Sequence, residues 1–257
     1  MESPVSPPPP LYSVPYQVGA GFILICVMFM LFGTLNAQAY FYAHTYKTDH
    51  YALRIFVATV WSLEIFHTVL CLHFFYEYFV LDIGTSEKLL EIPWSVWTSL
   101  FVEVTIIAVC QGCYIARLWR FSNRNVFVAG VPSLLVVGHF TTSFVSLWYM
   151  ATLKTWPAYD MHRPAQILIN ISVSLSALVD ILLVASIIFY LRKHVAGFRS
   201  ARGVFQTLIF LTVNTGAITV LGSLAILFLL NFMPGSLTYG ATLEVMGKLY
   251  ANAVFGL

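Results

Sequence analysis

One hydrophobic stretch, residues 61–79 (WSLEIFHTVLCLHFFYEYF), constrains the fold most, because it is long enough to cross a bilayer and yet carries ionisable side chains. Glu64 and His67 lie near its middle, and His73 and Glu77 lie near its end. An ionised side chain at the bilayer centre costs about 2.5 to 3.5 kcal/mol on insertion scales, so such groups face a protein interior or a water-filled cavity. The stretch therefore predicts a polyhelical membrane protein with a polar layer at mid-depth.

The composition excludes an ordinary water-facing surface, since 59% of the residues are hydrophobic and only 9% are charged. The net charge of +2 is too small to indicate nucleic acid as a partner. The cysteines all lie in apolar stretches, which excludes the disulfide framework of a small secreted domain; they are Cys26, Cys71, Cys110 and Cys113. We therefore expect the lipid bilayer to be the principal partner.

The chain divides into a Pro-rich extracellular or lumenal tail, residues 1–17, and a transmembrane domain, residues 18–257. Short polar loops separate the hydrophobic segments of this domain. The pattern predicts an all-α bundle of seven transmembrane helices, at about residues 18–42, 52–79, 94–118, 125–150, 165–191, 204–232 and 237–257.

The basic residues predict the orientation of this bundle. Nine of the 13 Lys and Arg residues lie in the first, third and fifth loops, and only three lie in the loops on the other side. Because loops rich in Lys and Arg remain in the cytoplasm, the N-terminus is expected outside and the C-terminus inside. The sequence thus predicts a multi-pass protein of the plasma membrane or an endomembrane, with basic inner loops that could meet a cytoplasmic protein.

The end of the third span predicts an anchor at the inner membrane interface. Arg117 and Arg120 can extend their charged groups to the lipid headgroups, while the indole ring of Trp119 lies at the interface. We expect anionic lipid to bind there.

Ionisable residues of several spans fall near mid-depth and form the candidate ligand-binding set, which comprises Glu64, His67, Glu103, His139, Asp180 and Lys248. Glu64 and His67 are three residues apart, so they share one helix face, and Cys71 continues that face. We expect the members on different helices to share one cavity. Two readings remain open: a structural hydrogen-bond network, or a ligand or reaction site.

Lys248 lies in the last span, where rhodopsins hold retinal. Glu244, four residues earlier, can pair with Lys248 along the helix, and the third span has no Asp in a counter-ion context, so we predict no retinal. The third span also lacks the acidic-Arg-Tyr ending of common G-protein-coupled receptors. His67, His73 and His139 match no recognised metal-ligand spacing, so we predict no metal and no cofactor.

Several motifs occur in a fixed order: Trp61-x-Leu-Glu-x-x-His67, Tyr76-x-Tyr, Gln111-x-x-Tyr-x-x-Arg117-Leu-Trp-x-x-Ser122, Asp180 and Lys248-Leu-Tyr-x-Asn252. Together they resemble a family of fungal seven-helix membrane proteins, typical of mushroom-forming basidiomycetes and catalogued as the 6534 domain of unknown function. The resemblance runs from about Tyr40 onward and implies seven helices and a fungal membrane, but no activity. Ala253 departs from the Ser that members usually carry after the last motif.

Two functions fit these patterns. We favour a receptor-like sensor over an enzyme, in which a small apolar or amphipathic molecule binds at the polar layer and biases two arrangements of the bundle. The alternative is a membrane-embedded enzyme that acts on a lipid-like substrate as an acid-initiated isomerase or cyclase. Its general acid would be a protonated Glu64 or Asp180.

Overall fold

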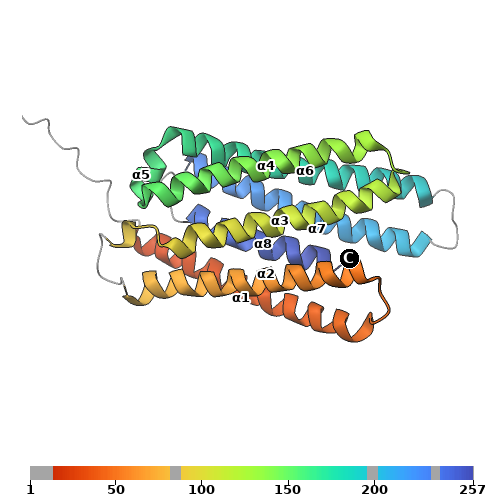
Figure 1. The fold of residues 1–257 in the computed structure, drawn as a ribbon, viewed down its shortest axis with the longest axis horizontal. Helices are drawn as coiled ribbons and strands as arrows, with labels where there is room; N and C mark the ends of the chain where they lie inside the picture. Colours follow the sequence, from red (N-terminus) through yellow and green to blue (C-terminus); the bar gives the residue numbers. More distant parts are fainter. Residues whose placement is uncertain (1–13, 82–87, 196–201, 233–237, 257) are drawn as a thin grey trace, which may run out of the picture.

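The computed structural model describes residues 14–81, 88–195, 202–232 and 238–256. In these residues the protein is a bundle of long helices that lie side by side along one axis (Figure 1). This confirms the predicted all-α fold class. Most of the predicted tail, the acidic residues Asp82 and Glu87, and residues 196–201 of the basic fifth loop lie outside the described residues.

Long apolar stretches form helices here because a helix satisfies its own backbone hydrogen bonds, which lipid cannot do. The described elements, in chain order, are α1 (Val14–Thr45), α2 (Tyr51–Tyr76), the π-helical turn η2 (Glu77–Leu81), the 3₁₀ turn η3 (Lys88–Leu90), α3 (Trp94–Phe121), α4 (Val126–Leu153), α5 (Trp156–Met161), α6 (Arg163–Val195), α7 (Arg202–Phe232) and α8 (Thr238–Phe255). The side chain of Asn125 caps α4 by accepting the backbone N–H of Phe127.

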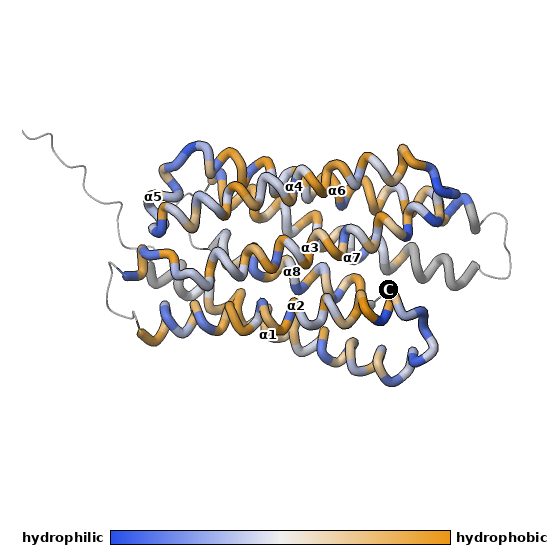
Figure 2. Tube along the Cα trace, viewed as in Figure 1, coloured by the Kyte–Doolittle hydropathy of each residue, from blue (hydrophilic) through white to orange (hydrophobic). Residues whose placement is uncertain are grey.

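Six of the described helices are long and apolar enough to cross a membrane, namely α1, α2 with η2, α3, α4, α6 and α7. In Figure 2 hydrophobic residues follow the length of the bundle, and hydrophilic residues gather at its two ends. The chain is therefore a multi-pass membrane protein. α8, which corresponds to the predicted seventh span, is not among these six helices, so the predicted count of seven spans is not confirmed.

α8 differs from the other helices because it lies inside the bundle. It packs against α1, α2, α3 and α7, and Figure 1 shows it among them. Its buried residues include Glu244 and Lys248, whereas α4 exposes large apolar side chains such as Phe127, Leu134 and Val137. Neighbouring helices thus shelter the polar groups of α8, and the outer helices present apolar surface to lipid.

Candidate functional site

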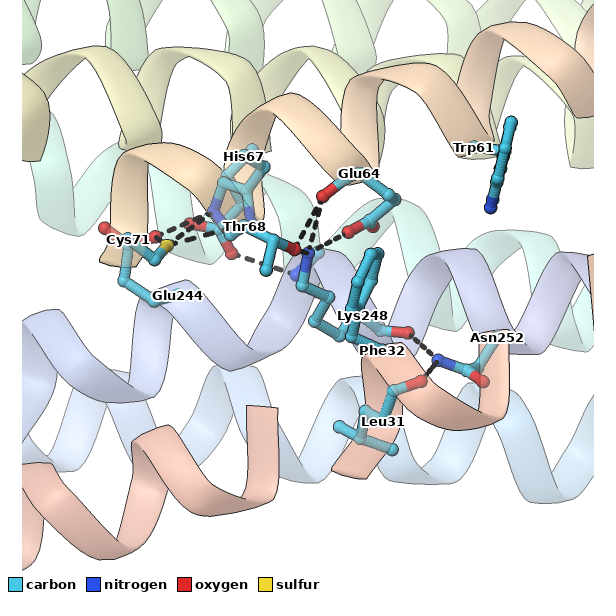
Figure 3. A network of polar contacts seen from close by, with 12 residues as sticks. Leu31, Phe32, Trp61, Glu64, His67, Thr68, Cys71, Glu244, Lys248 and Asn252 are labelled. Atoms are coloured by element: carbon cyan, nitrogen blue, oxygen red, sulfur yellow. Dashed lines mark hydrogen bonds and ion pairs between the residues drawn. The ribbon is translucent and has the colours of Figure 1, made fainter. Parts of the chain in front are cut away.

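The most highly charged part of the polar layer joins α2 to α8 (Figure 3). It consists of Glu64 and His67 on α2 and Glu244 and Lys248 on α8, and we call it the α2–α8 network. Lys248 of α8 forms an ion pair with Glu64 of α2, and both side chains are completely buried. The Lys248 ammonium also donates to Thr68 Oγ1 at 2.7 Å and to the Glu64 carbonyl oxygen at 3.1 Å. The ring of Phe32 from α1 lies 5.0 Å from the same nitrogen. Each ammonium proton therefore has an acceptor, which suits a structural ion pair.

Glu244, one turn before Lys248 on α8, reaches across to α2 and α3. Its Oε2 lies 2.7 Å from His67 Nε2 and 3.4 Å from Cys71 Sγ, and its Oε1 accepts the Ser99 hydroxyl at 2.6 Å. The predicted pairing of Glu244 with Lys248 along one helix is thus replaced by two pairs that cross from α8 to α2. The crossed pairs give Glu64 and His67 partners on α8. Without these pairs both side chains would be buried and unpaired.

Glu103 of α3 is held against the backbone of α8. Its Oε1 accepts the backbone N–H of Gly247 at 2.9 Å, and the side chain is only 2% exposed. A Cβ at position 247 would lie 3.0 Å from Glu103 Cγ, so the glycine allows this close approach. Glu103 therefore links the wall of the bundle directly to its central helix.

Asp180 of α6 forms a second, separate cluster with neutral donors. It accepts the hydroxyl of Tyr250 on α8 and the Gln111 amide of α3 at 3.2 Å. Thr219 of α7 also hydrogen-bonds to this carboxyl group. Ser176 lies 3.3 Å from the Tyr250 hydroxyl. The cluster thus connects four helices without a cationic partner among these contacts.

A third group of polar residues, which we call the α4–α6 cluster, surrounds His139. Nδ1 of His139 lies 3.0 Å from both the carbonyl oxygen and the hydroxyl of Ser172, and the Ser143 hydroxyl lies 2.5 Å from that of Ser172. Nε2 of His139 is buried and has no hydrogen-bond partner among the described residues. One ring nitrogen, Nδ1, is therefore held by Ser172. The other, Nε2, keeps an unused hydrogen-bonding position.

Three cavities adjoin these clusters. The smallest, of about 20 Å³, is lined by Asp180, Thr219 and Tyr250. The central cavity, of about 60 Å³, lies between α3, α4, α5, α6, α7 and α8 and has both Glu103 and His139 in its wall. Its remaining lining is mostly apolar, with several serines, which are Ser143, Ser146, Ser172, Ser176 and Ser223. The aromatic cavity, of about 90 Å³, lies nearer α5 and is lined by Glu244 together with Phe74, Phe75, Tyr78, Phe79 and Trp156.

The polar layer is thus divided, which corrects the expectation of one shared cavity. Glu64, His67 and Lys248 lie in the α2–α8 network, Asp180 has its own cluster, and only Glu103 and His139 face the central cavity. Glu64, His67, Glu103, Asp180 and Lys248 each have at least one partner on a neighbouring helix, although Glu64 Oε1 has no hydrogen-bond partner among the described residues.

Sequence reasoning missed Ser99 and gave Glu244 no place in the candidate set. One signal could have indicated Ser99. Ser95, Ser99 and Glu103 recur at four-residue spacing, which places a polar stripe on one face of α3, and all three are buried.

The predicted interface anchor lies in the last turns of α3. Arg117 and Trp119 are partly buried and Arg120 is exposed, and Trp119 borders a shallow groove between α3 and α4 with Gly112 and Gly130. Binding of anionic lipid to these residues stays a prediction.

Comparison with protein families gives one match. Residues 176–257, which span most of α6 and all of α7 and α8, match the model of a family of unknown function (DUF6534). This confirms the predicted resemblance to that family over residues 176–257, while the fungal origin is not confirmed. The matched part contains Asp180, Glu244, Lys248 and Tyr250. No match was found among curated proteins or among solved structures.

Proposed function

We propose that this membrane protein is a receptor-like sensor that binds a small apolar or amphipathic molecule in the central cavity. The observation that carries the proposal is that His139, a residue in the wall of that cavity, has a buried Nε2 without a hydrogen-bond partner among the described residues. A buried polar atom without a partner costs about 1 to 3 kcal/mol, so a ligand with one polar group would recover this energy by bonding to the imidazole. The apolar lining would hold the rest of the molecule.

The size of the cavity supports sensing as well as binding. An apolar cavity of about 150 Å³ can hold benzene. The central cavity, at about 60 Å³, therefore admits only a few heavy atoms unless the surrounding helices move apart. Binding of a larger molecule would favour a second, more open arrangement of the bundle, which is the requirement for a ligand-driven switch.

The contacts of Glu103 supply a route from the cavity to the rest of the bundle. Glu103 lines the cavity and holds the backbone of Gly247, and the next residue on α8 is Lys248 of the α2–α8 network. Displacement of α3 by a ligand would thus act on α8 and through it on α2. The basic inner loops would present the result to a cytoplasmic protein.

A pair of matched substitutions tests ligand binding. Ser223→Val places extra carbon in the central cavity, whereas Ser133→Val makes the same change on α4 outside it. Protein purified from its own membrane is extracted with organic solvent and analysed by mass spectrometry. A small molecule should accompany wild type and Ser133→Val, and it should be lost from Ser223→Val. Retention in both variants, or absence from wild type, would contradict the proposal.

The enzyme alternative is supported by Glu103, because a carboxyl group in the wall of the same cavity as His139 could transfer a proton to a substrate. The acids first considered are less suitable, since Glu64 is ion-paired with Lys248 and Asp180 is held by Tyr250 and Gln111. Glu103→Gln separates the two functions. An enzyme would retain its substrate unconverted, whereas a sensor would carry the same molecule as wild type.

The proposal includes seven spans, with α8 crossing inside the bundle, the N-terminus outside and the C-terminus in the cytoplasm. Glycosylation acceptors inserted after Leu90 and after Asn123 test this, because these positions lie in the second and third predicted loops. Only the first should be modified, and modification of the second would reverse the orientation.

A further inference from the structure

His67, Cys71 and Glu244 form a compact group of three different metal-ligating side chains. All three are buried, and one potential ligand atom from each lies within 4.8 Å of the other two. His67 and Cys71 are four residues apart on α2, so they project from one helix face, and Glu244 approaches from α8 (Figure 3). The mixed imidazole, thiol and carboxylate set is one that zinc and related metals accept.

The spacing of the three atoms is close to that around one metal ion. Tetrahedral bonds of ordinary zinc lengths place sulfur roughly 3.6 Å from a nitrogen or oxygen ligand, and nitrogen roughly 3.3 Å from oxygen. Here Cys71 Sγ lies 3.4 Å from Glu244 Oε2 and 3.8 Å from His67 Nε2. The His67 Nε2 to Glu244 Oε2 distance of 2.7 Å is that of a hydrogen bond, and it would have to lengthen by about 0.6 Å.

We propose that His67, Cys71 and Glu244 bind a divalent transition metal ion, with Zn²⁺ as the best fit. The ion would replace two protons. The thiol proton of Cys71 is released, and the proton shared by His67 Nε2 and Glu244 Oε2 moves to His67 Nδ1, so the imidazole stays neutral and binds through Nε2. One thiolate and one carboxylate balance the two positive charges, so the loaded site is neutral, as a membrane interior requires. The neighbouring Lys248–Glu64 ion pair is neutral as a whole and leaves that balance unchanged.

Two further contacts support the site. The Ser99 hydroxyl donates to Glu244 Oε1 at 2.6 Å, which fixes the carboxylate while Oε2 faces His67 and Cys71. Glu244 also lines the aromatic cavity, which gives an ion or a fourth ligand an approach from the α5 end. Three protein ligands and one open position are characteristic of reactive zinc sites, whereas structural sites have four protein ligands. The site shares no residue with the central cavity, so metal binding and ligand binding can be tested separately.

Cobalt provides the test, because Co²⁺ occupies zinc sites and a thiolate bond gives it an intense near-ultraviolet charge-transfer absorption. The full-length protein is purified in detergent, stripped with chelator and titrated with Co²⁺. Wild type should develop this absorption at one equivalent and lose it when Zn²⁺ is added. Cys71→Ser should abolish the absorption. Cys110→Ser is the matched control, since Cys110 is equally buried on α3 and is outside the group, and it should behave as wild type.

A second measurement keeps the test decisive if Cys71→Ser folds poorly. Glu244→Gln retains the size of the side chain and leaves Cys71 and Cys110 in place. It should weaken Co²⁺ binding at least tenfold. Zn²⁺, but not Mg²⁺, should raise the melting temperature of wild type and of Cys110→Ser. Absence of the absorption from folded wild type, or equal absorption in wild type and Glu244→Gln, would show that the group is only a hydrogen-bond network.

Discussion

The α2–α8 network and the α4–α6 cluster both bury a histidine inside the bundle, but they use it differently. His67 has Glu244 and Cys71 as partners beside an ion pair. His139 lines the central cavity, with Nδ1 held by Ser172 and Nε2 without a partner among the described residues. Burial of an ionisable group therefore does not by itself mark a binding site. A group with a spare hydrogen-bonding position beside empty space is the better candidate for ligand binding.

The largest effect is expected from Glu64→Leu, which removes the carboxylate that balances Lys248. Breaking a buried ion pair from one side costs about 3 to 5 kcal/mol, because it leaves a buried charge uncompensated. Thermal unfolding in detergent should show a large fall in melting temperature. The double variant Glu64→Leu with Lys248→Met should recover most of the loss. If Glu64→Leu alone were as stable as wild type, the ion pair would not distinguish the α2–α8 network from the α4–α6 cluster.

An intermediate effect is expected from Tyr250→Phe, which tests a carboxylate held by neutral donors alone. The variant removes one hydrogen bond to Asp180 and leaves the bonds from Gln111 and Thr219. A loss of about 1 to 3 kcal/mol should appear in thermal unfolding. Tyr149→Phe, on a tyrosine of α4 that is only partly buried, serves as the control and should change stability less. Equal losses in both variants would contradict a specific role for the Asp180 contact.

A smaller change in stability is expected from His139→Leu, although its effect on binding should be complete. The variant loses the Nδ1 contact with Ser172, which is worth about 0.5 to 1.5 kcal/mol, and it also removes the unpartnered nitrogen. Any molecule that accompanies the wild type should be lost, while the melting temperature falls only slightly. Retention of the molecule by this variant would show that the imidazole does not bind it.

The smallest effect concerns Asp160 in α5, outside the long helices. Burial raises the pKa of the Asp160 carboxyl above its usual range, and the hydrogen bond from the Tyr239 hydroxyl, at 3.3 Å, offsets part of that rise. The folded state then binds this proton more tightly than the unfolded state. The free energy of unfolding should therefore fall as pH rises through the interval between the unfolded and folded pKa values. The melting temperature of Asp160→Asn, measured at several pH values, should lack this fall. The same pH dependence in the variant and in wild type would contradict the assignment to Asp160.

The helical fold and the membership of the polar layer could be predicted from the sequence, but the pairing within the layer could not. Hydropathy and helix length determine where helices form, and Glu64, His67, Glu103, His139, Asp180 and Lys248 are all buried as their depth suggested. Partner choice depends on how each helix is rotated about its axis. Spacing along α8 made Glu244 the natural partner of Lys248, whereas packing directed both residues to α2.

The metal-ligand group and the central cavity were beyond sequence reasoning for a related physical reason. Cys71 and Glu244 are 173 residues apart, so no local spacing connects them. The cavity exists because side chains from six helices leave a gap among them. Its volume depends on packing details that no single segment contains.

The burial of α8 has a consequence for how the protein is made. A helix with Glu244, Lys248 and Asn252 on its surface enters lipid unfavourably by itself, and it is synthesised after the helices that surround it. Its entry into the bundle therefore depends on those earlier helices, which present Glu64, His67 and Ser99 to it. Only a correctly assembled set of preceding helices offers α8 the partners that make its entry favourable, so this step tests the assembly of the others.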